Sequence, residues 1–315
     1  MNVIEVEHLS RLFGSFKAVD DVNFEVYPGE IFGYLGANGA GKSTTIRMLC
    51  GLLAPSEGDA LVAGHRISQS PEAVKRSIGY MSQRFSLYLD LPVEENIEFF
   101  GGAYGLDGSR LRERRDELLA LVDLRPFLKV QTGALPGGIR QRLALCCSLL
   151  HRPKIVFLDE PTAGVDPAVR REFWTLIRAL SRQGVTVFVT THYMDEAEYC
   201  ARIGMMADGK LRALDTPTGL KRAWVPGEIL SFEGPGVAEG LEAARALPGV
   251  LAVEAFGAAW HVRFDTARCD PERLTRLFRS ADGAPLSVEP AEATLEDVFL
   301  AVVAREPTDP TTEAA

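Results

Sequence analysis

Short apolar runs alternate with longer stretches in which apolar residues recur at helical spacing along most of the chain. The runs predict buried strands, which lie at Val3–Leu9, Val22–Val26, Ile31–Leu35, Ile78–Ser82, Ile155–Leu158 and Val185–Thr190. The helical spacing predicts helices at Thr44–Cys50, Val93–Tyr104, Ser109–Leu124 and from Asp166-Pro167 to about Arg182. Because continuous apolar strands separated by helices need cover on both faces, the pattern predicts an α/β fold with a parallel sheet.

Two features divide this region further. Residues of about 84–150 carry mainly helical patterns, so we expect a helical subdomain inserted into the sheet-forming part. After about Ala223 the character of the sequence changes. We therefore predict a first domain over residues 1–223.

In the remainder of the chain the pattern of apolar residues predicts the order β-α-β-β-α-β. The first strand is expected at Ile229–Glu233 and a last short strand at Leu286–Glu289. This order predicts a small α+β domain of the ferredoxin-like type over residues 224–305. A capping box at Thr294–Asp297 opens a final helix. We expect the apolar stripe of this helix to pack on its own domain; the stripe consists of Leu295, Val298, Phe299, Val302 and Val303. Residues 306–315 are predicted to be a disordered tail.

Composition narrows the possible classes of protein. The 315 residues are 46% apolar and 24% charged, which is ordinary for a globular protein. The net charge of −9 argues against a surface that coats nucleic acid, which would be basic. No apolar run approaches the roughly 20 residues of a membrane helix, and residues 1–10 lack the layout of a signal peptide. The five cysteines show no Cys-x-x-Cys spacing, which favours small core residues in a reducing compartment.

The stretch Gly36–Thr44 fits the pattern of a phosphate-binding loop, in which glycine and four residues precede Gly-Lys-Ser. A predicted strand precedes it and a predicted helix follows it. This context aims backbone N–H groups and the positive end of the helix dipole at one point, where a nucleotide phosphate fits. Lys42 is expected to reach the β- and γ-phosphates, and the Ser43 hydroxyl to ligate Mg²⁺. The expected nucleotide-binding residues of the loop are Gly36, Asn38, Gly39, Ala40, Gly41, Lys42, Ser43 and Thr44.

Further polar residues follow the ends of predicted strands. Gln83, Asp159, Glu160 and His192 all lie at or just past such ends, as does Gly36. Ligands of parallel sheets sit beyond the carboxyl ends of the strands, so we expect these residues in one cleft. Taken singly, each has an ordinary structural explanation: a polar strand end for Gln83, a surface acidic pair for Asp159-Glu160, and a hydrogen-bonded structural histidine for His192.

Three motifs in fixed order, Gly36–Thr44, Leu135–Arg142 and Ile155–Asp166, resemble those of the ATP-binding subunits of ABC transporters. Within that family the chain is most similar to exporter subunits of the daunorubicin-resistance type. The resemblance covers about residues 1–223. The run Gln83–Tyr88 is close to that branch, and Thr294–Leu300 is similar to the tail helix of such exporters.

The resemblance implies a role for each of these residues. Asp159 and Gln83 would contact Mg²⁺, Glu160 would polarise the attacking water, and His192 would touch the γ-phosphate. Gln83 would also link the nucleotide to the membrane subunit. Asp166, by itself a helix N-cap, would lie at the dimer junction. Phe13 is our choice for the aromatic ring that stacks on adenine, and Phe16 is the alternative.

The signature segment departs from the family pattern. Where the family usually has Leu-Ser-Gly-Gly-Gln, this chain has Leu135, Pro136, Gly137, Gly138 and Ile139. The resemblance implies that this segment contacts the γ-phosphate held by the opposite subunit. Pro136 supplies neither a hydroxyl nor an N–H, whereas Gly137 and Gly138 keep their N–H groups. We therefore expect weakened or asymmetric hydrolysis.

The resemblance thus implies an ATPase with ATP and Mg²⁺ as cofactors, acting as the motor of a membrane exporter of a drug or lipid-like substrate. It implies a dimer with itself or a sister subunit, separate transmembrane permease subunits, and a place on the cytoplasmic face of the cell membrane. Residues from Gln83 into 91–105 would dock the permease. Two alternatives remain open at this point: a soluble ATPase of the same superfamily acting in translation or DNA repair, and a nucleotide sensor that does not hydrolyse ATP.

Overall fold

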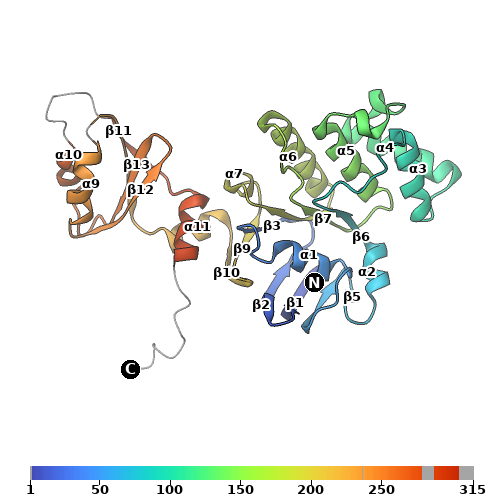
Figure 1. The fold of residues 1–315 in the computed structure, drawn as a ribbon, viewed down its shortest axis with the longest axis horizontal. Helices are drawn as coiled ribbons and strands as arrows, with labels where there is room; N and C mark the ends of the chain where they lie inside the picture. The colour runs from blue at the N-terminus through green and yellow to red at the C-terminus, as the bar shows by residue number, and fades with distance from the viewer. Residues whose placement is uncertain (1, 236, 279–286, 305–315) are drawn as a thin grey trace. The chain divides into compact units, whose positions relative to one another are not determined.

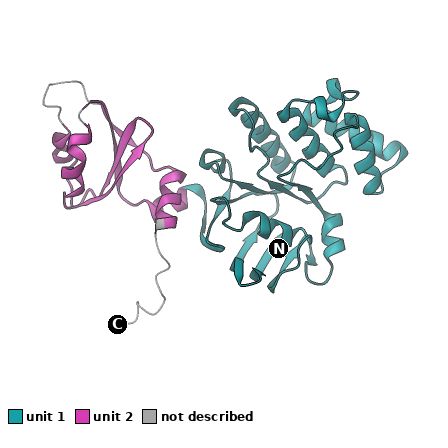
Figure 2. Ribbon diagram, viewed as in Figure 1, with its two compact units in different colours: residues 1–217 teal, residues 218–315 magenta. Residues whose placement is uncertain are grey.

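The computed structural model describes residues 2–235, 237–278 and 287–304. It divides into two compact units, residues 1–217 and 218–315 (Figure 2). The division falls at the start of α8 (Pro217–Trp224), a few residues before the boundary expected at residue 223. The predicted tail over residues 306–315 lies outside the described residues.

A six-stranded sheet forms the centre of the first unit, in the order β10-β9-β3-β8-β7-β6 (Figure 1). Neighbouring strands from β9 to β6 run parallel, and β10 is added antiparallel through a hairpin. The strands are β3 (Ile31–Gly36), β6 (Ile78–Met81), β7 (Ile155–Asp159), β8 (Thr186–Thr191), β9 (Arg202–Ala207) and β10 (Lys210–Asp215). The predicted α/β fold with a parallel sheet is confirmed.

Helices cover both faces of this sheet, as buried parallel strands require. On one face α1 (Lys42–Leu49) lies between the six-stranded sheet and a second sheet (Figure 1). The opposite face is covered by α5 and α6 (Figure 1). The helices packed around the sheet are α2 (Pro71–Ser77), α5 (Gly137–Leu149), α6 (Pro167–Arg182) and α7 (Met194–Ala197).

The second sheet is antiparallel and has the order β2-β1-β4-β5. Its strands are β1 (Ile4–Phe13), β2 (Phe16–Val26), β4 (Glu57–Val62) and β5 (His65–Arg66). β1 and β2 are longer than predicted, because their pairing continues through register shifts as far as Phe13 opposite Phe16. One hydrophobic core joins the two sheets, and the stacked rings of Phe24 and Phe32, with centroids 5.4 Å apart, lie in it.

The helical region consists of α3 (Val93–Ala103), α4 (Gly108–Val122), α5 and two short 3₁₀ turns, η1 (Arg125–Phe127) and η2 (Thr132–Ala134). The segment before α3 is irregular and is held by the buried side chain of Asn96. Asn96 accepts a hydrogen bond from the Tyr88 N–H (3.0 Å) and donates to the Tyr88 carbonyl (2.8 Å) and to Thr132 Oγ1 (2.9 Å). One buried amide therefore fixes how this segment leaves the sheet.

The second unit has the predicted order β-α-β-β-α-β in one antiparallel sheet, β12-β13-β11-β14. Its elements are β11 (Glu228–Glu233), α9 (Val237–Arg245), β12 (Val250–Phe256), β13 (Ala259–Phe264), α10 (Pro271–Leu277), β14 (Ser287–Ala291) and α11 (Leu295–Ala304). The capping box of α11 is present, since the Asp297 N–H donates to Thr294 Oγ1 and the Thr294 N–H donates to Asp297 Oδ2. The apolar stripe is narrower than expected: Leu295, Val298 and Val302 are buried, whereas Val303 is 51% exposed.

All five cysteines are free and buried, as expected for small core side chains. Within residues 2–235, 237–278 and 287–304, none of the helices has the length and apolar character needed to cross a bilayer.

We predict that Gly79→Ala destabilises the first unit. A Cβ at Gly79 in β6 would lie 2.4 Å from the Ser148 carbonyl oxygen in α5, and neither backbone can move without separating the helix from the sheet. Overpacking of this kind costs about 1–3 kcal/mol, to be measured as the free energy of unfolding in urea. Gly102→Ala in α3 is the control, because its Cβ meets nothing within 4 Å and alanine favours a helix. Equal stability of the two variants would contradict the prediction.

Candidate nucleotide site

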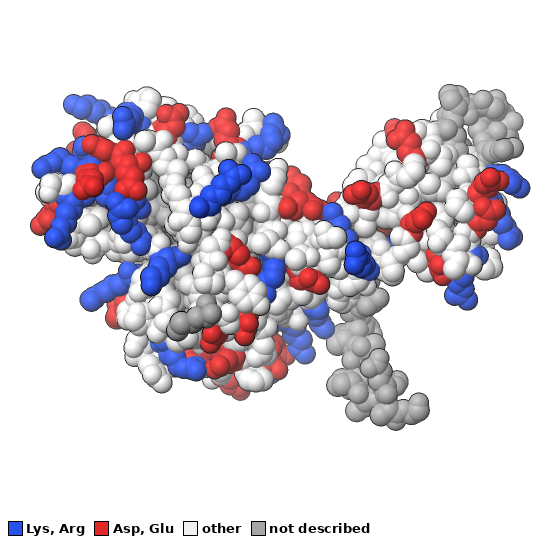
Figure 3. All heavy atoms as spheres, turned by 180° about the vertical axis from the view of Figure 1, so that it is seen from behind, with Lys and Arg blue, Asp and Glu red and all other residues white. Residues whose placement is uncertain are grey.

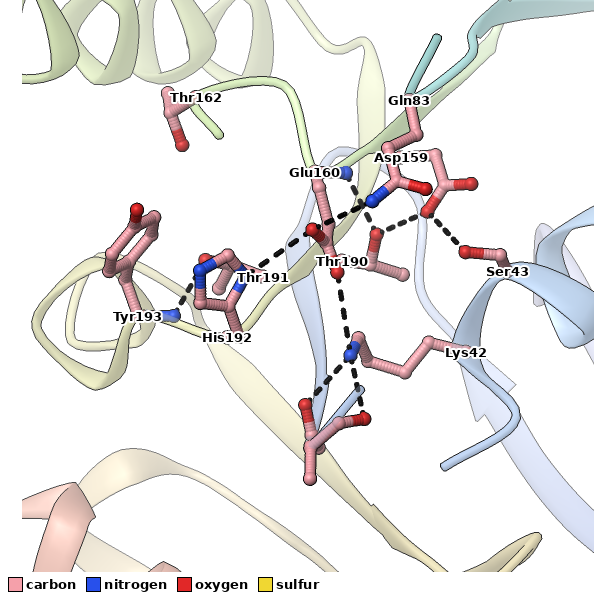
Figure 4. Close-up of polar contacts among 12 residues, drawn as sticks. Lys42, Ser43, Gln83, Asp159, Glu160, Thr162, Thr190, Thr191, His192 and Tyr193 are labelled. Carbon is pink, nitrogen blue, oxygen red and sulfur yellow. Dashed lines mark hydrogen bonds and ion pairs between the residues drawn. The ribbon is translucent and has the colours of Figure 1, made fainter. Parts of the chain in front are cut away.

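Several polar residues of the first unit meet at the carboxyl edge of the six-stranded sheet (Figure 4). Gly36 is the last residue of β3, and Asp159 is the last residue of β7. Gln83 follows the end of β6, and His192 follows the end of β8. The parallel register therefore brings together residues that lie far apart in the sequence.

The backbone of the loop between β3 and α1 packs closely against the backbone of two other segments. A Cβ at Gly36 would lie 2.5 Å from the Met206 carbonyl oxygen, and one at Gly41 would lie 2.5 Å from the Ala18 carbonyl oxygen. Gly41, with φ 105°, is also in the left-handed region that favours glycine. Both positions thus require glycine, and Gly41 is the N-cap from which the N–H groups of α1 point outward.

A cavity of about 380 Å³ lies over this loop. Its size is suitable for a nucleotide-sized ligand. It is lined by Phe13, Phe16, Ala18, Asn38, Gly39, Gly41, Lys42, Ser43, Thr44, Gln83 and Glu160. Phe13 and Phe16 are 49% and 63% exposed, and the guanidinium of Arg11 lies 4.8 Å from the Phe13 ring centroid. Both candidate adenine contacts therefore line the same cavity.

Lys42 is the cation of the site, and only 4% of it is exposed. Its Nζ donates to the carbonyl oxygens of Gly36 (2.7 Å) and Ala37 (3.1 Å) and lies 3.5 Å from Glu160 Oε1. Burial lowers the pKa of Lys42 below its ordinary value, and the Glu160 carboxylate opposes this effect. The ammonium group is thus held at the mouth of the loop by carbonyls and one carboxylate.

Asp159 is bound by two hydroxyl groups. Ser43 Oγ and Thr190 Oγ1 both donate to Asp159 Oδ1, at 3.1 Å and 2.7 Å. Burial raises the pKa of Asp159, while these two hydrogen bonds act in the opposite direction. The carboxylate is therefore oriented toward the first turn of α1.

Glu160 occupies the centre of the site and has a left-handed backbone, with φ 48°. This conformation is costly for a residue other than glycine, and the Glu160 N–H is engaged here, donating to Thr190 Oγ1 at 2.9 Å. Glu160 Oε2 accepts a hydrogen bond from Gln83 Nε2 (3.1 Å) and lies 3.3 Å from His192 Nδ1. With Lys42 on its other oxygen, this carboxylate is the point where the predicted residues meet.

The structure places the signature segment elsewhere. Leu135–Ile139 surrounds the start of α5, with Pro136 as the N-cap, and no residue of it lines the described cavity. Gly138 packs against α6, where a Cβ would lie 2.2 Å from Val169 Cγ1. Asp166 caps α6 by accepting a hydrogen bond from the Ala168 N–H at 2.8 Å. These residues do not share a pocket with the phosphate loop of the same chain.

Sequence reasoning missed Thr190, which bonds both acidic residues of the site. The signal for it was weak, because a threonine at the end of an apolar strand is common. It also missed the hydrogen bond between Thr162 and Glu196. These residues are 34 positions apart in the sequence, and only the folded chain brings them together.

The donor set suits a hard divalent cation. Ser43 Oγ, Asp159 Oδ1 and the Gln83 amide supply oxygen, which Mg²⁺ prefers. Among the described residues no group of three or more His, Cys, Asp or Glu side chains is placed to hold a metal ion. Mg²⁺ is commonly bound by one or two carboxylates together with substrate phosphates, and a set of this composition could hold it.

Comparisons with known proteins agree with this geometry. The family described as ABC transporter matches residues 19–163. The probable multidrug ABC transporter ATP-binding protein YbhF of Escherichia coli is 54% identical over 219 residues, which cover 70% of this chain and 38% of YbhF. The daunorubicin/doxorubicin resistance ATP-binding protein DrrA of Streptomyces peucetius is 36% identical, over 99% of this chain and 96% of DrrA.

The fold is also similar to that of a solved structure. The dimeric post-hydrolysis state of an ATP-binding cassette bound to ADP and Pi has a TM-score of 0.62 and 26% identity, and the match covers 68% of this chain and 98% of that one. The similarity to DrrA extends over both proteins almost completely. The chain therefore belongs to the family of ATP-binding subunits of ABC transporters.

Proposed function

We propose that this chain is the ATP-hydrolysing motor subunit of a membrane exporter. The observation that carries the proposal is the Glu160 carboxylate, which meets Lys42, Gln83 and His192 at the mouth of the phosphate loop. Phosphoryl transfer depends on positioning and charge neutralisation more than on covalent chemistry. A carboxylate, a cation and two polar side chains around one point supply these functions.

The residues divide the work by position. Loop N–H groups and the N-terminus of α1 hold the phosphates. Lys42 exchanges its carbonyl partners for phosphate oxygens, which are stronger partners for an ammonium group. Glu160 orients the attacking water and accepts its proton, and His192 contacts the γ-phosphate. Ser43, Asp159 and Gln83 would hold Mg²⁺, which supplies charge neutralisation at the β- and γ-oxygens when bound.

A second ATP-binding subunit completes the site. The signature segment lies outside the cavity of its own chain, which leaves it available to the phosphates bound by a partner. The solved cassette with ADP and Pi is dimeric, which supports this arrangement. At each such junction Gly137 and Gly138 present N–H groups at the start of α5, and Asp166 lies at the start of α6.

Separate transmembrane permease subunits would dock beside Gln83, and the chain would then lie on the cytoplasmic face of the membrane. Supporting this, aromatic rings lie close together within the segment expected to dock: the exposed rings of Tyr88 and Phe99 are 4.8 Å apart, and the half-buried Phe100 is 5.4 Å from Phe99. Exposed apolar patches of this kind mark interaction surfaces. YbhF is named for multidrug transport and DrrA for drug resistance, which favours export of a drug or lipid-like substrate.

These names also favour a transporter over an ATPase of translation or DNA repair. A nucleic-acid partner would require basic side chains gathered on one face. On the face drawn in Figure 3, acidic and basic side chains are intermixed.

We predict that Glu160→Gln abolishes turnover without weakening ATP binding. The amide cannot accept the proton of water, so kcat should fall by about 10²- to 10⁴-fold, while the Kd for ATP is unchanged and the dimer persists in ATP. ATPase assays, calorimetric titration and light scattering measure these three quantities. Glu113→Gln, on the exposed face of α4, is the control. Wild-type turnover in Glu160→Gln would remove Glu160 from this role.

We predict that Pro136→Ser raises kcat. Serine restores a hydroxyl and an N–H toward the partner's γ-phosphate, and a charge-assisted hydrogen bond contributes about 1.5–3 kcal/mol. This corresponds to roughly tenfold to hundredfold in rate, measured with the permease present. If neither protein hydrolyses ATP under these conditions, the chain is a nucleotide sensor rather than a motor.

We predict that Phe13→Ala weakens ATP binding. Loss of a stacking ring costs about 1–3 kcal/mol per base, whereas the affinity for inorganic triphosphate should stay the same because it has no base. Calorimetric titration with both ligands measures the difference, and Phe16→Ala is the matched variant. A loss confined to Phe16→Ala would assign the stacking role to Phe16.

A further inference from the structure

A buried carboxylate that the proposed chemistry does not use lies behind the site. Glu196, in α7, is only 1% exposed. Its Oε1 accepts a hydrogen bond from Thr162 Oγ1, and its Oε2 accepts one from Thr191 Oγ1, both at 2.6 Å. Both oxygens of the carboxylate are thus engaged by hydroxyl groups from two other segments.

These two segments carry Glu160 and His192, which the proposed function places at the γ-phosphate. Thr162 lies in the loop that follows Glu160 and leads to Asp166, and Thr191 immediately precedes His192 (Figure 4). The loop that contains Thr162 begins with a hydrogen-bonded turn, in which the Ala163 N–H donates to the Glu160 carbonyl at 3.1 Å. A displacement of Thr162 would therefore reach Glu160 through a short, hydrogen-bonded stretch of chain.

A third segment joins the same carboxylate. Arg170 of α6 has its Nε 3.4 Å from Glu196 Oε1. The Arg170 guanidinium also lies over the ring of Tyr193, at 3.7 Å from the centroid, and Tyr193 follows His192. Arg170 thus places a positive charge beside the buried carboxylate, whose two oxygens each orient one threonine hydroxyl.

We propose that Glu196 is a positioning residue for ATP hydrolysis, which fixes Glu160 and His192 relative to one another by holding Thr162 and Thr191. This inference rests on the proposed function. Glu160 Oε2 and His192 Nδ1 are 3.3 Å apart, and attack on a phosphate tolerates little displacement of either group. Neither threonine lines the cavity, so the network acts on catalysis rather than on nucleotide binding.

The test compares hydroxyl and methyl groups of nearly equal shape in the full-length chain. Thr162→Val and Thr191→Val remove one hydroxyl each, and Glu196→Gln keeps the size of the side chain. We expect kcat to fall on the order of tenfold or more in each, with KM for ATP unchanged. Thr162→Ser, which keeps the hydroxyl, should retain wild-type kcat.

Thr186→Val is the matched control. Thr186 is buried on β8, the strand that ends at Thr191, and its hydroxyl, like that of Thr162, makes one hydrogen bond, accepting from the Gly29 N–H at 2.9 Å. Thr186 is the first residue of β8, at the end of the strand opposite to Thr191 and the site. Its variant should lose thermal stability comparable to that of Thr162→Val but keep wild-type kcat.

The outcomes separate this inference from the proposed function. If the wild-type chain fails to hydrolyse ATP even with its permease, the proposed function fails. If the wild type hydrolyses ATP and Thr162→Val, Thr191→Val and Glu196→Gln match its kcat, the positioning role is overturned. The same follows if Thr186→Val loses as much kcat as Thr162→Val, because the effect would then be one of stability alone.

Discussion

All strands of a parallel sheet end in the same direction at one edge, and the site of this protein depends on that constraint. Asp159 pairs with Thr190 across β7 and β8, and Leu35 pairs with Thr191 across β3 and β8. A change of one residue in either register would turn the side chains at the strand ends to the other face. The apolar residues of β3, β7 and β8, all buried, fix that register.

Charge compensation is the second requirement of this edge. Lys42, Asp159 and Glu160 are all buried, and buried charges are tolerated only with partners. Each carries several: carbonyl oxygens and Glu160 for Lys42, hydroxyl groups for Asp159, and Lys42 and Gln83 for Glu160. A polar network in which most groups are satisfied is rigid, and rigidity is what electrostatic catalysis of phosphoryl transfer requires.

Short segments of the first unit connect the site at this edge to the proposed partner surfaces. Asn96 of α3 is hydrogen-bonded to Tyr88, in the segment that follows Gln83. Gln83, at the start of this segment, is hydrogen-bonded to the Glu160 carboxylate. A permease docked on the aromatic rings near Tyr88 would therefore contact a segment that reaches the site. The loop after Glu160 leads to the cap of α6, where the proposed partner subunit lies. Glu196 connects that loop with the end of β8. The proposed places of hydrolysis, dimer contact and membrane coupling thus share a few short segments.

The sequence by itself determined the phosphate loop, the parallel sheet and the strand-end positions of Gln83, Asp159, Glu160 and His192, because glycine spacing and apolar runs are local signals. It also predicted the order of elements in the second unit. Only the tertiary structure decided which groups touch. It extended β1 and β2 as far as Phe13 and Phe16, exposed Val303, and joined Thr162 to Glu196. Such contacts depend on the register and packing of segments distant in the chain, and no local pattern of residues records them.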